Sequence, residues 1–304
     1  MKQEDYDFFK ENGYLSLGKI LSDDEVTRFG ELFDRNRRDF GDYWGDNGIW
    51  QTQHCDSLLT APAFDEVIRH PKAMGALQGL MGDEVCFSEI CLRHMGPYAG
   101  EPLPGMRSWE GRVGRRWHRD GGPDTMWSEH PLRIGYVQMM VYLEDVNETT
   151  HSFAVSPQAF DQEFLDPEAQ LDRGGIHDLY GRAGTAVLFN ITRLHTVTVR
   201  PTQSERKSVQ IYYGHRHREF LSHQSFVPTK LWRDHTDGEV RGFYGVLNGK
   251  TQEFLQRTAG RDEVPVNEAL EILADIRENV NLAKKYGPRW RYTVRGTRRK
   301  VRKV

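Results

Sequence analysis

The spacing of hydrophobic and polar residues divides the chain into a helical beginning, a strand-rich middle and a helical end. Residues 4–40 are expected to be helical, with Ser22-Asp-Asp-Glu25 as a capping box before apolar residues that share one helical face, Val26, Phe29, Leu32 and Phe33. A second helical stretch is expected over 61–81, with a break or kink at Pro71. These patterns predict helices that supply core residues rather than site residues.

From Val85 onward the pattern changes to short segments rich in β-branched and aromatic residues, separated by Gly, Pro, Asn or Asp. The segments expected to be strands are 85–93, 134–143, 184–190, 195–200 and 207–216. No helical pattern regularly follows each strand, as a βαβ fold would require. The sequence therefore predicts a mainly β protein with flanking helices (α+β), built on a jelly-roll core.

We expect one domain over residues 1–304, without internal repeats. Its parts are a helical N-terminal part (1–84), a β core (85–220), C-terminal loops and a helix (221–288), and a basic tail (289–304). The C-terminal helix has Asn267 as its expected N-cap and ends at Gly287-Pro288.

Composition favours a globular protein that folds without disulfide bonds or a structural metal. A chain of 304 residues buries enough surface to need neither. The three cysteines are scattered and form no C-x-x-C pair, so neither a disulfide framework nor a zinc–thiolate site is expected. No apolar run approaches the roughly 18–20 residues that cross a bilayer, and the N-terminus carries acids where a signal peptide is apolar. A cytoplasmic location is the resulting prediction.

The formal net charge of −3 conceals an uneven distribution. Residues 289–304 contain eight Lys or Arg and no acid, so the remainder carries −11. Such a tail suits nucleic acid, an anionic surface, or pairing with the body of the protein or a neighbouring subunit. Nucleic-acid binding is the less favoured interpretation, and the oligomeric state is left open.

Candidate chemistry centres on Trp117-His118-Arg119-Asp120. Side chains two apart in an extended segment point the same way, so His118 and Asp120 face one cavity. Non-haem Fe(II) oxygenases bind their metal with two histidines and one carboxylate. His195, where a strand breaks into a polar turn and restarts, is the candidate for the third ligand.

A second polar row follows eleven residues after His195. Arg206, Ser208 and Gln210 share one face of an expected strand. The guanidinium of Arg206 and the hydroxyl of Ser208 can therefore contact one carboxylate group of a bound ligand.

This ordered set resembles the phytanoyl-CoA dioxygenase-like branch of the Fe(II)/2-oxoglutarate-dependent oxygenases. The resemblance covers most of the chain. It also includes Gly13-Tyr14-Leu15, the segment from Arg93 to Pro97, and the segment from Gln138 through Asp145 to Ser156-Pro157.

The resemblance implies a double-stranded β-helix and an enzyme that uses Fe(II), 2-oxoglutarate and O2. It implies that His118, Asp120 and His195 bind the metal and that Arg206 with Ser208 binds the distal carboxylate of 2-oxoglutarate. Gln138 and Arg93 are weaker matches for cosubstrate contacts. Hydroxylation of a small molecule, with release of succinate and CO2, is the default outcome, and desaturation, epoxidation or ring formation begin in the same way.

The chain departs from the family pattern at one turn. Ser156-Pro157-Gln158-Ala159 stands where the family often has a Pro-Gly-Ser-His-like turn, which affects subfamily placement more than chemistry. The carboxylate of Asp120 is retained, whereas related halogenases replace it with a small residue. Halogenation is therefore disfavoured.

Two rival functions use the same residues differently. A cupin-like metalloenzyme would need the metal ligands but not Arg206, and a non-catalytic binding protein would recruit a partner through its basic tail. His215 and His217 form a rival metal pair, ranked lower because no carboxylate of matching parity lies nearby.

The loop 96–117 has five glycines and three prolines and is a candidate lid. Its cationic residues suggest a substrate with an anionic group, and a solvated basic face is the alternative. They are Arg107, Arg112, Arg115 and Arg116.

Overall fold

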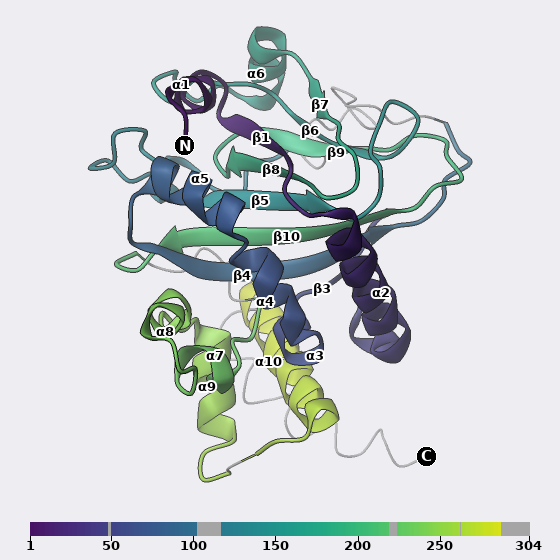
Figure 1. The fold of residues 1–304 in the computed structure, drawn as a ribbon, viewed down its shortest axis with the longest axis vertical. Helices are drawn as coiled ribbons and strands as arrows, with labels where there is room; N and C mark the ends of the chain where they lie inside the picture. Colours follow the sequence, from purple (N-terminus) through teal and green to yellow (C-terminus); the bar gives the residue numbers. More distant parts are fainter. Residues whose placement is uncertain (48–49, 102–116, 219–223, 262, 287–304) are drawn as a thin grey trace. The chain divides into compact units, whose positions relative to one another are not determined.

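The computed structural model describes residues 1–47, 50–101, 117–218, 224–261 and 263–286 (Figure 1). The chain forms two compact units, Met1–Val246 and Leu247–Val304. All residues of the predicted site belong to the first unit. In the described part of the chain, no helix is both long enough and apolar enough to cross a membrane.

Two antiparallel sheets form the centre of the first unit (Figure 1). The larger has the order β1-β8-β5-β10-β4-β3-β2 and the smaller the order β7-β6-β9. The larger sheet consists of β1 (Tyr14–Lys19), β2 (Gly45–Asp46), β3 (Thr52–His54), β4 (Val85–Met95), β5 (Val137–Tyr142), β8 (Thr185–Asn190) and β10 (Arg206–His215). The smaller consists of β6 (Ser152–Val155), β7 (His177–Leu179) and β9 (His195–Thr198).

The two faces of the larger sheet have different neighbours. Tyr213 on β10 donates its hydroxyl to the carbonyl of Ile68, so this face is covered by helices. Tyr142 on β5 points to the opposite face and donates to the carbonyl of Leu179 on β7, at 2.8 Å. The second face therefore packs against the smaller sheet. A core cluster lies between the sheets: Tyr14, Met140, Tyr142, Val146, Phe153, Val155, Leu179, Val187 and Phe189.

The expected helices are present, but they are interrupted. The first unit contains α1 (Gln3–Asn12), α2 (Asp23–Asp39), α3 (Ser57–Thr60), α4 (Asp65–Ile68), α5 (Pro71–Met81), α6 (Pro167–Gly174), α7 (Thr229–Trp232) and α8 (Gly238–Tyr244), with 3-10 turns at Gly41–Tyr43, Pro62–Phe64 and Pro123–Thr125. The capping box at the start of α2 is confirmed, since Ser22 and Glu25 exchange side-chain and backbone hydrogen bonds. Pro71 begins α5, where a missing N–H costs nothing.

Describing residues 1–84 as a helical part was wrong in one respect, because β1, β2 and β3 belong to the larger sheet. Helix α1 ends at Gly13, whose φ of 74° few other residues adopt, and the chain turns there into β1. The Gly13 carbonyl accepts a hydrogen bond from the Asn190 backbone. The strand β1 was missed because its pairing partner, β8, is distant in sequence.

The second unit contains α9 (Gly249–Arg257) and α10 (Val266–Tyr286). Arg257 on α9 binds Asp275 on α10 at 2.6 Å. The end of the predicted C-terminal helix agrees with the structure, but α10 begins at Val266, one residue before the expected cap Asn267. The basic tail 289–304 lies outside the described residues.

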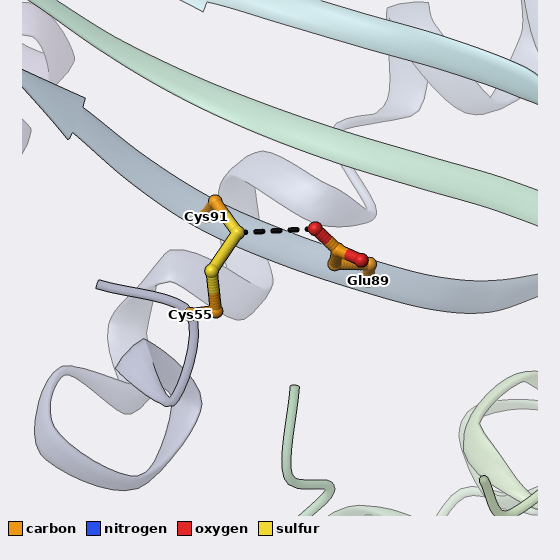
Figure 2. Close-up of side chains that lie close together, drawn as sticks. All are labelled: Cys55, Glu89 and Cys91. Carbon is orange, nitrogen blue, oxygen red and sulfur yellow. Dashed lines mark hydrogen bonds between the residues drawn. A yellow bond between two sulfur atoms is a disulfide. The ribbon is translucent and has the colours of Figure 1, made fainter. Parts of the chain in front are cut away.

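The structure contains a disulfide, which the sequence did not predict. Cys55 and Cys91 are bonded, whereas Cys86 is free and buried (Figure 2). The register of β3 against β4 pairs Gln53 with Arg93 and, continued by two residues, sets Cys55 opposite Cys91. Only strand pairing brings these cysteines together, because 36 positions separate them in sequence.

Removal of this disulfide is expected to lower stability. Cys55→Ala should reduce the free energy of unfolding by about 2–4 kcal/mol, because the unfolded chain loses a constraint on its freedom. Denaturant titration under non-reducing conditions measures the effect. A dithiol reductant should destabilise the wild type similarly and leave Cys55→Ala unchanged; equal stability of wild type and variant without reductant would contradict the prediction.

Candidate metal centre and cosubstrate site

A short antiparallel pairing of the segment around His118 with the start of β9 builds the centre of the site. The backbones of His118 and His195 exchange two hydrogen bonds, of 3.0 and 2.9 Å, and the N–H of Asp120 donates to the Ile191 carbonyl. Trp117, buried in a cluster with Leu194, anchors the first segment. These contacts fix both segments before any ligand is considered.

The three predicted metal-binding side chains converge at this pairing. Asp120 lies between the histidines: its Oδ1 is 3.5 Å from His118 Nε2, and its Oδ2 is 3.5 Å from His195 Nε2. One ligand atom from each residue lies within 4.8 Å of the others. Two imidazoles and one carboxylate form the donor set of a non-haem Fe(II) centre, so the residues fit this metal. His118 is half-exposed and His195 is buried, which leaves the centre accessible from one side.

The orientation of His195 is set by its surroundings. Its Nδ1 is 2.9 Å from the carbonyl oxygen of Arg193, which can only accept, so Nδ1 carries the ring proton and donates it there, and Nε2 is left for a metal. The ring packs against Phe153 and Phe189, with centroid distances of 5.4 and 4.9 Å. A polar turn precedes it, in which Asn190 Oδ1 accepts hydrogen bonds from Thr192.

Asp120 is held ionised and oriented. Burial alone would raise the pKa of its carboxyl group, but His195, His118 and the hydroxyl of Tyr212 together lower that pKa below its ordinary value. Tyr212 on β10 donates to Asp120 Oδ2 at 2.6 Å. Sequence reasoning missed Tyr212, although it has the same parity on its strand as Arg206 and Ser208.

Polar groups without partners line the same inner face of the larger sheet. Arg206 is 2 % exposed, and burial lowers its pKa to about 10. Among the described residues, its Nε and Nη1 have no hydrogen-bond partner, and neither do Ser208 Oγ or both side-chain atoms of Gln138. The register pairs Gln138 with Tyr212 and Ser208 with Arg93. Buried polar groups are normally paired, so this row indicates room for a polar ligand.

The row of polar groups continues onto β4 and towards β3. Arg93 is half-buried on β4, and its Nε has no partner in the described structure. Arg206 Nη2 donates to Gln51 Oε1 at 3.3 Å, across 155 positions of sequence. Gln51 could not have been found from the sequence, because only the pairing of β3 with β4 brings it to the arginine.

The rival metal pair is not assembled. His215 Nε2 is 3.2 Å from the Ile134 carbonyl, and burial lowers the pKa of this histidine to about 4. His217 Nε2 instead contacts Glu84 at 2.7 Å. The cationic residues between 107 and 116 lie outside the described residues.

Solved structures resemble this fold. SnoK, a non-heme α-ketoglutarate-dependent carbocyclase from nogalamycin biosynthesis, is 17% identical, with 71% of this chain and 85% of that chain covered and a TM-score of 0.57. EctD from S. alaskensis with 2-oxoglutarate and 5-hydroxyectoine is 17% identical over 75% and 82%, with a TM-score of 0.56. HygX from Streptomyces hygroscopicus with nickel and 2-oxoglutarate bound is 17% identical over 80% and 95%, with a TM-score of 0.54.

No protein-family model matches the sequence, and no curated protein sequence does. The chain has the fold of Fe(II)/2-oxoglutarate-dependent oxygenases, which confirms the predicted double-stranded β-helix with its two antiparallel sheets. At such low identity the similarity concerns the fold alone.

The hydroxyl of Tyr212 is expected to support metal binding. Tyr212→Phe removes the donor to Asp120, so the carboxylate is held less firmly, and affinity for Mn(II) or Fe(II) should fall about tenfold. Anaerobic metal titration measures this. The control is Tyr213→Phe, which loses a buried hydrogen bond on the opposite face; it should cost stability and leave metal affinity unchanged. Equal metal affinity in Tyr212→Phe and wild type would contradict the role.

Proposed function

We propose that this protein is an Fe(II)/2-oxoglutarate-dependent oxygenase that hydroxylates a small molecule and releases succinate and CO2. The observation that carries the proposal is Arg206, a buried guanidinium on the inner face of the sheet. Its electrostatic neighbours are Tyr142 and a second cation, Arg93. A buried charge without a counter-ion is costly, so a bound carboxylate would balance it.

The two ends of 2-oxoglutarate have complementary groups in this site. Arg206 and Ser208 would bind the distal carboxylate, since a guanidinium fork matches a carboxylate in geometry and charge. Gln138, beside Tyr212 in the sheet, and Arg93 would supply further polar contacts. The cosubstrate would thereby be oriented between Arg206 and the metal centre.

His118, Asp120 and His195 would hold the iron. When bound, iron with 2-oxoglutarate and O2 supplies the oxidising chemistry for an unactivated carbon. The protein would keep Nε2 of His195 free through the Arg193 carbonyl and would hold Asp120 ionised through Tyr212. Phe153 and Phe189 would exclude water from the buried side of the centre.

Hydroxylation is proposed as the default among several outcomes. SnoK is described as a carbocyclase and SnoN as an epimerase, although both are α-ketoglutarate-dependent. Dependence on α-ketoglutarate therefore accompanies different reactions in proteins of this fold. The protein would act in the cytoplasm on a substrate that carries an anionic group.

A cupin-like metalloenzyme that does not use 2-oxoglutarate is the second candidate. It would account for the metal centre but not for the unpaired groups of Arg206, Ser208 and Gln138 on the same face. A non-catalytic binding protein would equally leave the assembled ligands unexplained. The oxygenase is favoured because it uses both sets of residues.

Anaerobic addition of Fe(II) and 2-oxoglutarate to the wild-type protein is expected to give a weak visible charge-transfer band. On exposure to air the protein should form succinate slowly without added substrate. Asp120→Ala should lose the band and succinate formation while remaining folded, as checked by circular dichroism, because it removes one ligand. A fully metal-loaded wild type without the band would exclude 2-oxoglutarate as cosubstrate.

Arg206→Gln is expected to weaken 2-oxoglutarate binding about 10–100-fold, because it removes charge-assisted hydrogen bonds to the distal carboxylate. Calorimetric titration of the Mn(II)-loaded protein measures the affinity. Arg200→Gln is a matched control that breaks an ion pair with Asp178 on the smaller sheet and should leave the affinity unchanged. Unimpaired binding and activity in Arg206→Gln would favour the cupin-like candidate.

A further inference from the structure

The Cys55–Cys91 pair lies on the same face of the larger sheet as the proposed cosubstrate site. In the register of β4 against β10, Cys91 is opposite Gln210, one alternation away from the pair of Arg93 and Ser208. Cys55 continues the row of β3 that begins with Gln51. The sulfur atoms therefore lie on the same face of the sheet as the unpaired polar groups.

This disulfide adds a covalent tie beside a short strand, which His54 also anchors through a 2.9 Å contact with Asn36. β3 has three residues, pairs with β4 on one side and with the two-residue strand β2 on the other. Its N-terminal neighbour Gln51 provides the hydrogen bond to Arg206. The disulfide at Cys55 thus restrains β3, and β3 positions Gln51 beside Arg206.

The reduced pair has an alternative contact. Oε1 of Glu89, a residue 2 % exposed, is 3.1 Å from Cys91 Sγ (Figure 2). A Cys91 thiol donates a hydrogen bond to this carboxylate, whereas a disulfide sulfur has no proton to donate. Each redox state therefore has one interaction that the other lacks, namely the S–S bond or the thiol–carboxylate hydrogen bond.

One of the two sulfurs lies beside an exposed side chain. Cys55 Sγ is 3.6 Å from Oε1 of Gln224, an exposed residue. Cys55 therefore contacts a residue that solvent reaches, whereas Cys91 is fully buried. The remaining cysteine does not compete, because burial raises the pKa of Cys86 to about 12 and keeps its thiol protonated.

We propose that Cys55 and Cys91 form a reversible thiol–disulfide site that controls 2-oxoglutarate affinity through β3 and Gln51. The oxidised form fixes β3 and keeps Gln51 on Arg206; the reduced form releases β3 and weakens cosubstrate binding. This rests on the proposed function for the role of Arg206. A disulfide in a chain large enough to fold without one, and proposed to be cytoplasmic, suits a regulatory bond better than a structural staple.

The chemistry balances with a peroxide as oxidant and a dithiol as reductant. Two thiols lose two protons and two electrons, the S–S bond forms, the O–O bond of hydrogen peroxide breaks, and two waters leave. In the reverse direction a dithiol attacks the disulfide by thiol–disulfide exchange, so both protein thiols are restored and the reductant becomes a disulfide.

The test compares 2-oxoglutarate binding to the full-length Mn(II)-loaded protein in its two redox states. Protein treated with hydrogen peroxide and protein reduced with a dithiol are desalted anaerobically, and their thiols are counted by alkylation and mass spectrometry. Calorimetry should show about tenfold weaker binding in the reduced protein. Equal affinities in the two states would overturn the proposal.

Three variants separate the coupling from general damage. Cys86→Ser should keep the full redox response. Cys55→Ala should show the affinity of the reduced wild type in both conditions. Gln51→Ala, which leaves the disulfide intact, should bind weakly even when oxidised and lose most of the response; wild-type affinity in the oxidised Gln51→Ala protein would overturn the route through β3.

Failure of the proposed function has a different signature. If neither redox state of the wild type binds 2-oxoglutarate, the cosubstrate assignment itself fails. If oxidised wild type binds it and the reduced protein, folded by circular dichroism, binds it equally, only the redox control fails.

Discussion

The backbone pairing of His118 with His195 is the constraint on which the candidate site depends. Two hydrogen bonds join segments that are 77 positions apart, and they set the ring centroids of these histidines 4.3 Å from each other. Asp120, two residues after His118, is placed by the hydrogen bond from its backbone N–H to the Ile191 carbonyl. The metal-binding geometry is therefore a property of the paired backbone and exists before a metal binds.

The inner face of the larger sheet combines apolar packing with unsatisfied polar groups. Tyr142 and Phe189 belong to a buried core on this face, while Arg206, Ser208 and Gln138 leave hydrogen-bonding atoms unused there. Such groups would destabilise the protein if no ligand balanced them. The face is thus partly structural and partly a binding surface, and Tyr212 connects the two by contacting Asp120.

The proposed redox control depends on the short strand β3. Three residues give a strand little backbone pairing, so a covalent bond beside it restrains it more than it would restrain a central strand. Cys55 and Gln51 flank β3 at its two ends, so the disulfide and the contact with Arg206 are joined by three residues of chain.

The sequence by itself determined five strands of the core, namely β4, β5, β8, β9 and β10, together with the capping box of α2 and the shared parity of His118 with Asp120 and of Arg206 with Ser208, because periodicity and capping are local. It did not reveal β1, the strands β6 and β7 of the smaller sheet, the Cys55–Cys91 bond, or the contact of Gln51 with Arg206. Those depend on the register between distant segments, which no local pattern encodes and which only the burial of whole sheets selects. Tyr212 is an intermediate case. The sequence pattern places it on the same strand face as Arg206 and Ser208, but only the tertiary structure brings its hydroxyl to Asp120.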